Sequence, residues 1–264
     1  MVTGLDCSPI FFGSSPLRVP DQFAFWLPFL TGGLHTMVIS PPSATPDVPY
    51  DPPADQGLDL VYLDEAMVVV SKPAGLLSVP GRGEGRLDCM ASRVLQRHAD
   101  ALIVHRLDMA TSGLLLLARG ADMHRVLSGH FEARRVHKRY VAVLHGLIEA
   151  DEGEVNLPLI TDWPNRPMQM VCTQRGKPSL TRYRVLSRDL QARQTRVELT
   201  PITGRSHQLR VHMLALGHAI VGDPLYGDQA VQGAFSRLML HACQLDLPHP
   251  VTGQPLSLCS PSPF

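Results

Sequence analysis

The chain has 264 residues, of which 44% are hydrophobic and 18% charged, so it can bury a sizeable core as one large domain or two small ones. No apolar run reaches the roughly 18–20 residues that span a bilayer, and the N-terminus lacks the pattern of a secretory signal, so we expect a cytoplasmic protein. The five cysteines show no Cys-x-x-Cys spacing and the 12 histidines are dispersed, which argues against a metal site or a disulfide framework.

The net charge is zero, but the charges are unevenly distributed. Residues 1–60 hold six acids and one base, for a net charge of −5, and residues 61–264 hold 18 acids and 23 bases, for a net charge of +5. A mildly basic larger part suits the binding of phosphate groups. Of the 24 bases, 21 are arginines, a preference that a genome-wide codon bias also explains.

The first 48 residues differ in composition from the rest of the chain. They are rich in Pro, Ser, Thr and Gly and show no sustained hydrophobic period, although the apolar stretch 23–30 interrupts them. This composition predicts a poorly ordered extension of unknown role. We expect residues 49–264 to form the folded domain.

Regular structure is predicted from residue 58 onward. The β-rich runs 58–63 and 67–71 are joined by three residues and predict a β-hairpin. Residues 72–82, KPAGLLSVPGR, are typical of a turn that ends the second strand, and residues 85–99 carry apolar side chains at helical spacing.

The stretch 103–118, IVHRLDMATSGLLLLA, is a buried-strand pattern interrupted by polar groups around Asp108. A carboxylate on a turn between buried strands can be held rigidly, as catalytic groups are. An Asp close to Thr111 and Ser112 more commonly only caps its turn through backbone hydrogen bonds. The residues alone leave both roles open.

Residues 121–134 predict an amphipathic helix that ends in a basic run and leads into a strand at 140–144. Such a basic run is usually a solvated face. The segment 162–167, DWPNRP, is too polar and too rich in proline for a core strand and predicts an exposed loop.

The last third of the chain predicts strands around one helix. Residues 179–186 and 195–200 alternate in the manner of an antiparallel sheet with one wet face, and residues 237–247 and 255–258 predict two further strands. Between them a helix should run from about His207 to Leu216, with Ser206 as its N-cap. Arg210 lies among apolar residues of this helix, so we expect it to have an acidic partner.

Two motifs, HRLDMATSG at 105–113 and GRSHQLRVHMLALGH at 204–218, resemble the signatures of the RluA family of RNA pseudouridine synthases. The resemblance covers residues 50–264. It implies an α+β fold, with a long, bent, mostly antiparallel sheet, flanking helices and a central cleft. It also implies isomerisation of a uridine within RNA, a reaction that requires no metal or other cofactor.

The resemblance assigns roles to particular residues. It implies that Asp108 is the nucleophile, that Arg210 pairs with Asp108, and that Tyr140 stacks on the target base. Whether Asp108 attacks the sugar C1′ or the uracil C6 stays open. The residues expected to contact RNA are His105, Arg106, Arg134, Arg135, Lys138, Arg166, Arg205 and His207.

Met109-Ala110, the loop 162–167 and the expected lack of an N-terminal RNA-binding module resemble one type within this family. That type modifies a loop uridine of 23S rRNA and the first uridine of the anticodon loop of certain tRNAs, and we expect this dual specificity in a monomer. A synthase for a single rRNA or tRNA site is the alternative. A glycosidase-like hydrolase would need a second catalytic carboxylate, and a non-catalytic RNA-binding protein would not need Asp108.

Overall fold

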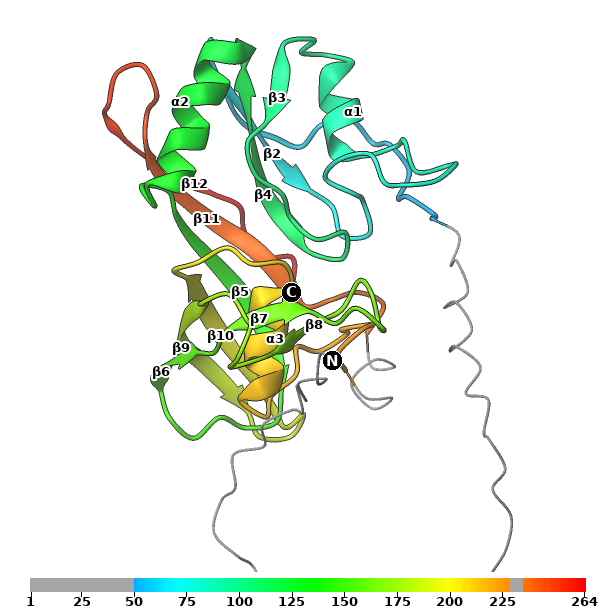
Figure 1. Ribbon diagram of the computed structural model, residues 1–264, viewed down its shortest axis with the longest axis vertical. Helices are drawn as coiled ribbons and strands as arrows, with labels where there is room; N and C mark the ends of the chain where they lie inside the picture. Colours follow the sequence, from blue (N-terminus) through cyan, green and yellow to red (C-terminus); the bar gives the residue numbers. More distant parts are fainter. Residues whose placement is uncertain (1–49, 228–234) are drawn as a thin grey trace, which may run out of the picture. The chain divides into compact units, whose positions relative to one another are not determined.

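The computed structural model describes residues 50–227 and 235–264, so the predicted extension 1–48 lies outside the described residues. The regular structure of the described chain is mainly β-strand, with three helices (Figure 1). The strands are β1 (Leu60–Leu63), β2 (Met67–Lys72), β3 (Ala101–Ile103), β4 (Ser112–Arg119), β5 (His137–His145), β6 (Glu152–Asn156), β7 (Leu159–Thr161), β8 (Gln169–Val171), β9 (Leu180–Asp189), β10 (Gln194–Pro201), β11 (Leu240–Pro248) and β12 (Pro255–Cys259). The helices are α1 (Met90–Leu95), α2 (Gly120–Glu132) and α3 (Gln208–Ala215).

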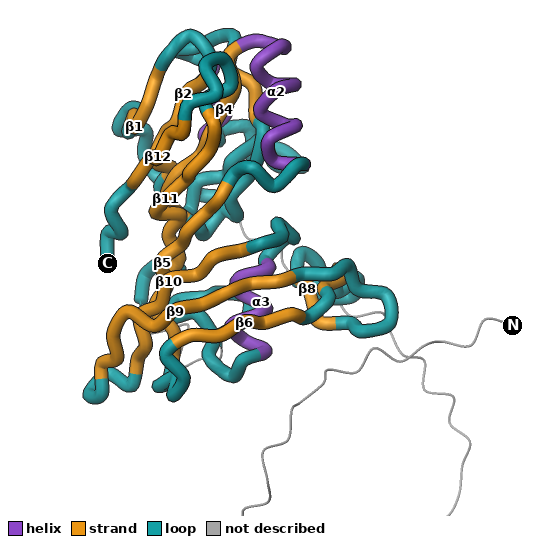
Figure 2. Tube along the Cα trace, turned by 90° about the vertical axis from the view of Figure 1, so that its left-hand side faces the viewer, coloured by secondary structure: helices purple, strands orange, loops and turns teal. Residues whose placement is uncertain are grey.

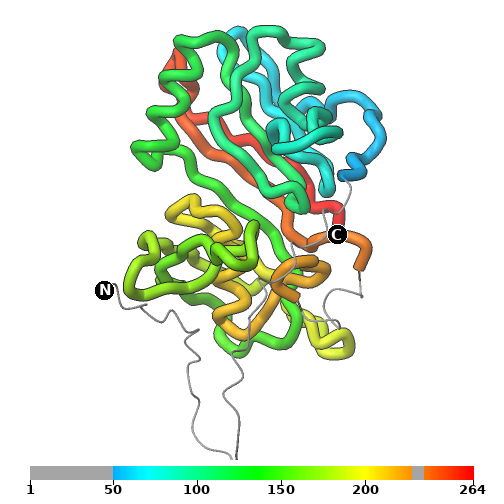
Figure 3. The backbone as a smooth tube through the Cα atoms, turned by 45° about the vertical axis from the view of Figure 1, so that its right-hand side comes forward, coloured from blue at the N-terminus to red at the C-terminus, as the bar shows by residue number. Residues whose placement is uncertain are grey.

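Ten strands form one mixed sheet in the order β1-β2-β4-β11-β5-β10-β9-β6, with β12 paired to β11 and β3 paired to β4. Every pair in this sheet is antiparallel except β4 with β11. β5 and β11 lie in the middle of the order and run diagonally between its two ends (Figure 3). The architecture confirms the expected α+β fold with a long, mostly antiparallel sheet.

Strands β2 and β4 read as continuous apolar runs because both of their faces are buried. Val68, Val70, Leu115 and Leu117 face a core that includes residues of α1 and α3. Their alternate neighbours in both strands face a second core, which includes Leu127 of α2. A strand covered on both faces lacks the alternation of polar and apolar residues that marks a half-exposed strand.

The smaller sheet, β7 with β8, and strand β6 are not among the predicted elements. α3 contacts β8 on one side and β9 and β10 on the other, so it lies between the hairpin and the large sheet (Figure 2). This packing explains why most of α3 is buried.

Several predicted boundaries are wrong, among them that of the strand expected at 140–144, which begins at His137. The helix expected over residues 85–99 is limited to α1, because Gly81 closes a turn on Arg86 and Cys89 caps the helix through Ser92. The strand expected from residue 237 begins at Leu240. The predicted β1–β2 hairpin, the exposed 162–167 loop and the strands near 140, 180, 195 and 255 are confirmed.

Gly113 is required where β11 meets β4. It has φ +109°, and a Cβ at this position would overlap the backbone of Ala242, its parallel partner in β11. A side chain here would therefore separate the two strands that join the halves of the sheet.

We predict that Gly113→Ala lowers the free energy of unfolding by about 3 kcal/mol, because the new methyl group overlaps backbone that cannot move aside. Urea unfolding followed by circular dichroism measures this. Gly129→Ala is the control, since Gly129 lies inside α2 with open space around it and should gain up to about 1 kcal/mol. Equal stability of the Gly113 variant and the unchanged protein would contradict the prediction.

Candidate active site

Asp108 lies on the loop between β3 and β4, and backbone contacts hold both of its neighbours. The Ser78 hydroxyl accepts a hydrogen bond from the Leu107 amide at 3.1 Å and donates one to the Leu107 carbonyl at 2.8 Å. On the other side, the Gly75 amide and the Lys72 ammonium both donate to the Met109 carbonyl. The Gly- and Pro-rich segment 72–78 is therefore the support of the Asp108 loop.

Lys72 is buried and donates three hydrogen bonds to carbonyl oxygens, those of Pro73, Leu76 and Met109, at 2.6–3.1 Å. Burial lowers its pKa to about 7, although the nearby Asp108 carboxylate opposes this shift. These contacts are structural, so the interpretation of this segment as a turn agrees with the structure.

Arg210 of α3 is 3% exposed and lies between two carboxylates. Its Nε and Nη2 atoms donate to Asp223 at 2.7 and 2.6 Å, while its Nη1 atom is 3.6 Å from the nearer oxygen of Asp108. Burial lowers the pKa of Arg210, but the hydrogen bonds and charge of Asp223 and the charge of Asp108 raise it above its usual value. The prediction of an acidic partner is therefore correct, but the expected partner Asp108 is the second and more distant one.

Asp223 is a functional residue that the sequence interpretation missed. It is fully buried, and besides Arg210 it accepts hydrogen bonds from the amides of Leu225 and Tyr226. The segment 222–227, GDPLYG, contains an Asp before Pro, which favours a turn whose carboxylate bonds the following amides. The sequence signal that could have found Asp223 is this Asp-Pro turn, which follows Arg210 closely in the chain.

His207, one of the residues expected to contact RNA, lies beside Asp108. Its Nδ1 atom is 2.7 Å from the Tyr226 hydroxyl and its Nε2 atom is 4.0 Å from Asp108. Burial lowers its pKa, although Asp108 opposes the shift.

His207 is also the N-cap of α3, with φ +53° and no side-chain cap, so the expectation that Ser206 caps this helix is wrong. The side-chain oxygen of Gln208 holds the loop before the helix instead, because it accepts hydrogen bonds from the Thr203 hydroxyl and the Arg205 backbone amide.

Tyr140 of β5 lies near enough to Asp108 to be affected by its charge. It is buried, and burial together with the charge of Asp108 raises its pKa, so the ring stays a neutral phenol. The structure thus brings together Asp108, Tyr140, and the pair His207 and Arg210 of the α3 segment, from three separate parts of the sequence.

His105, one of the residues expected to contact RNA, also supports strand β4. Its Nε2 atom accepts a hydrogen bond from the Leu116 amide at 3.0 Å, and its ring stacks on Phe131 of α2. Burial and the nearby Lys138 lower its pKa to about 3. The neutral imidazole therefore holds the strand, and its contact with RNA stays a prediction.

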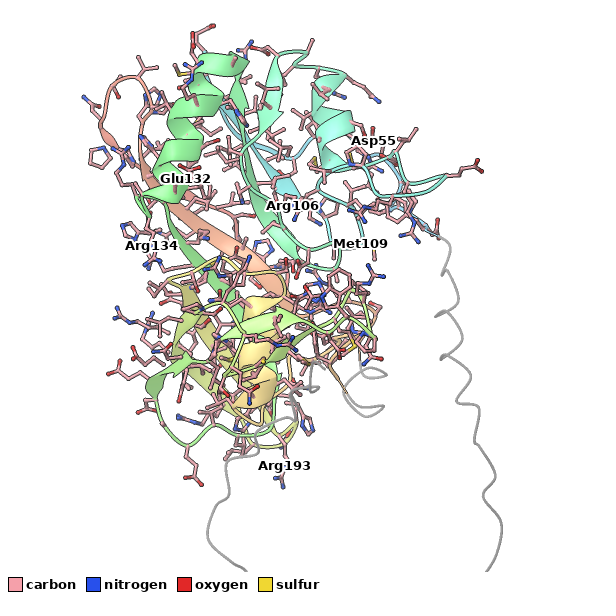
Figure 4. The ribbon with its side chains drawn as sticks, in the orientation of Figure 1. Asp55, Arg106, Met109, Glu132, Arg134 and Arg193 are labelled. Carbon is pink, nitrogen blue, oxygen red and sulfur yellow. The ribbon has the colours of Figure 1, made fainter. Side chains whose placement is uncertain are left out.

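The other expected RNA contacts are spread over the surface. Arg106 is exposed beside Asp108 and makes no hydrogen bond or ion pair within the described residues, and Figure 4 shows it together with Met109 in this loop. Arg134 and Arg135 are exposed beyond the end of α2, where Figure 4 labels Arg134. Lys138 is partly buried near Phe131, and Arg205 is exposed next to Gly204.

Within residues 50–227 and 235–264, His, Cys, Asp and Glu side chains form no group of three that could hold a metal ion. In the same ranges no helix combines the length and apolar character needed to cross a bilayer.

Comparison with known proteins identifies relatives of this site and fold. Residues 66–215 match the family model described as RNA pseudouridylate synthase. The chain is 50% identical over 217 residues to a protein of Pasteurella multocida named dual-specificity RNA pseudouridine synthase RluA, a match covering 82% of this chain and 99% of that protein. A protein of the same name from Escherichia coli is 47% identical over 81% of this chain and 98% of its own length.

Solved structures agree with these matches. The structure of human RNA pseudouridylate synthase domain containing 1 is similar with a TM-score of 0.69 and 30% identity, covering 81% of this chain and 87% of that one. Human RNA pseudouridylate synthase domain containing 4 is similar with a TM-score of 0.62 and 27% identity, covering 77% and 88%.

We predict that Asp223→Asn lowers the free energy of unfolding by about 3 kcal/mol, because it leaves the Arg210 guanidinium buried without its closest counter-charge. Urea unfolding at neutral pH measures the loss. The control is Asp100→Asn, whose carboxylate pairs with Arg119 at the surface and should contribute less than about 1 kcal/mol. Similar losses in both variants would mean that the buried pair is not a main support of this region.

Proposed function

The chain belongs to the family of RNA pseudouridylate synthases, and from this premise we propose that Asp108 is the nucleophile with which it isomerises uridine in RNA. In this reaction the bond between C1′ and N1 breaks, the uracil turns, and C5 bonds to C1′. C5 must lose its proton, and N1 gains one, so the formula is unchanged. A carboxylate suits this sequence because it can form a covalent intermediate and then leave.

One observation carries the proposal: the Asp108 carboxylate is 3.6 Å from a buried guanidinium whose other edge is already occupied by Asp223. The guanidinium is a fixed positive charge beside the Asp108 carboxylate and would hold it in position for attack. Because the distance exceeds that of a direct hydrogen bond, the carboxylate oxygens remain available to react. With its side chain 29% exposed, Asp108 is accessible to a nucleotide, whereas Arg210 is not.

Tyr140 and Arg106 would act on either side of the flipped uridine. A base removed from its stack needs an apolar surface, and the neutral ring of Tyr140 offers one within the field of Asp108. Arg106 is exposed and unpaired within the described residues, so its side chain is available to occupy the space that the uridine vacates.

The remaining contacts would be made with RNA phosphates. The residues suited to this are Arg134, Arg135, Lys138 and Arg205, whose cations lie at or near the surface. His207 would instead orient Asp108, since its ring lies between the carboxylate and Tyr226.

We further propose two RNA substrates, a loop of 23S rRNA and the anticodon stem-loop of tRNA. The support is that relatives about half identical to this chain are named dual-specificity RNA pseudouridine synthases. A single chain in the cytoplasm would be the active unit. Residues 49–264 would form the catalytic domain, preceded by residues 1–48 as an extension.

A glycosidase-like reaction is less well supported. Such enzymes use a second carboxylate as a general acid or base. The other carboxylate of this site, Asp223, is fully buried and accepts hydrogen bonds from Arg210, Leu225 and Tyr226, so it has no free oxygen to offer a substrate.

Tritium release from RNA labelled at C5 of uridine tests the proposal, because C5 loses its hydrogen in the reaction. The substrates are unmodified tRNA and a 23S rRNA fragment, each with wild type, Asp108→Asn and Asp122→Asn. We expect wild type to act on both RNAs, Asp108→Asn to lose at least about 1,000-fold in rate, and Asp122→Asn, an exposed residue of α2, to match wild type. Activity on one RNA alone would limit the specificity to that RNA, and full activity of Asp108→Asn would exclude it as the nucleophile.

A further inference from the structure

The loop between β7 and β8 presents an aromatic side chain to solvent close to the site. Trp163 is 66% exposed, which is unusual for the largest apolar side chain. The Arg166 guanidinium lies over its ring at 4.6 Å from the ring centre. Within residues 50–227 and 235–264, the other apolar residues exposed to a similar degree, such as Leu190 and Val251, are aliphatic.

Internal hydrogen bonds hold the loop in shape. The Asp162 amide donates to the Met168 carbonyl, and the Met168 amide donates to the Asn165 carbonyl, both at 3.0 Å. The Asn165 side chain donates to the Asp162 carboxylate at 2.9 Å. Asp162 is thus engaged within the loop, while Trp163 and Arg166 face outward on a formed turn.

Hydrogen bonds through Tyr226 connect the hairpin to the residues beside Asp108. The Gln169 amide of β8 donates to the Tyr226 hydroxyl at 2.7 Å, and the same hydroxyl is 2.7 Å from His207, which neighbours Asp108. Leu159 of β7 packs with Tyr226 and with Val211 of α3. Through these contacts the loop has a fixed position relative to the nucleophile.

We propose that Trp163 is a stacking platform for an unpaired nucleobase of the RNA that carries the target uridine, with Arg166 supporting the ring and facing the phosphate backbone. Aromatic side chains beside arginine are the chemistry by which proteins hold single-stranded bases outside a reaction centre. The occupant is RNA rather than a protein because Tyr226 and His207 connect the hairpin to Asp108, where the RNA substrate must bind. This inference rests on the proposed function for the identity of the RNA.

Binding of fluorescently labelled RNA tests the platform, with an unmodified anticodon stem-loop and a pool of hairpins with randomised loops as probes. The proteins are wild type, Trp163→Ala, Trp163→Phe, Arg166→Ala and the control Leu190→Ala, a residue 73% exposed in the β9–β10 turn. We expect Trp163→Ala to weaken binding about 10-fold or more, Trp163→Phe to keep most of the affinity, and Leu190→Ala to have no effect. The loss should appear in KM more than in kcat.

A direct signal is available because the sequence has only two tryptophans, Trp26 and Trp163. In a Trp26→Phe protein, RNA should quench the remaining fluorescence as a base stacks on the indole. A set of RNA stem-loops, each with an abasic site at one unpaired position, would identify that base. In the stem-loop that lacks it, Trp163→Ala should no longer reduce the RNA affinity.

The outcomes separate this inference from the proposed function. Equal RNA affinity of Trp163→Ala and wild type, with normal turnover, would overturn the platform alone, as would equal losses in Trp163→Ala and Trp163→Phe. If wild type forms no pseudouridine in either proposed substrate but still loses hairpin affinity through Trp163→Ala, the substrates are wrong and the platform stands. Unfolding curves of all variants exclude general destabilisation as the cause.

Discussion

The site depends on one buried guanidinium that serves two carboxylates. Burying an arginine without a counter-charge costs several kcal/mol, so Arg210 can lie in the core of α3 only because Asp223 neutralises it at 2.6 to 2.7 Å. Since Asp223 occupies one edge of the guanidinium, the other edge reaches Asp108 across 3.6 Å without binding it tightly. The arrangement separates two tasks, because Asp223 neutralises the buried arginine and the arginine places a positive charge beside the partly exposed carboxylate of Asp108.

Parts of the chain far apart in sequence fix that geometry from two sides. On one side, segment 72–78 binds the backbone before and after Asp108, and the close approach of β11 to Gly113 holds the strand that follows. On the other, the segment around Asp223 and Tyr226 connects α3 to the β7–β8 hairpin. The central strands β5 and β11 belong to the same sheet as both groups, so the carboxylate and its cation are positioned by one continuous scaffold.

Local patterns predicted the parts of this structure that are determined locally. The β1–β2 hairpin, the amphipathic α2 and the apolar β4 were evident from residue spacing, and the motif around Asp108 identified the family. The pairing of β4 with β11 joins residues about 130 apart and has no signature in either strand. The nearer partner of Arg210 could not be identified from its motif, because Asp223 reaches it only after the chain turns back. The support that His105 gives to β4 could not be predicted either, because its ring accepts a hydrogen bond from Leu116, which lies beyond the turn of the motif.

The most direct test of the account is the chemical identity of the covalent intermediate. RNA with 5-fluorouridine at the target position lacks the C5 hydrogen that the reaction removes, so the enzyme should remain covalently bound to this RNA. Trypsin digestion of the adduct followed by mass spectrometry identifies the peptide that carries the RNA. The tryptic peptide from Leu107 to Arg119 contains a single side-chain carboxylate, that of Asp108. The account predicts the RNA-derived mass on this peptide and its absence in Asp108→Asn. An adduct on any other peptide, or an unchanged adduct in the Asp108→Asn protein, would contradict it.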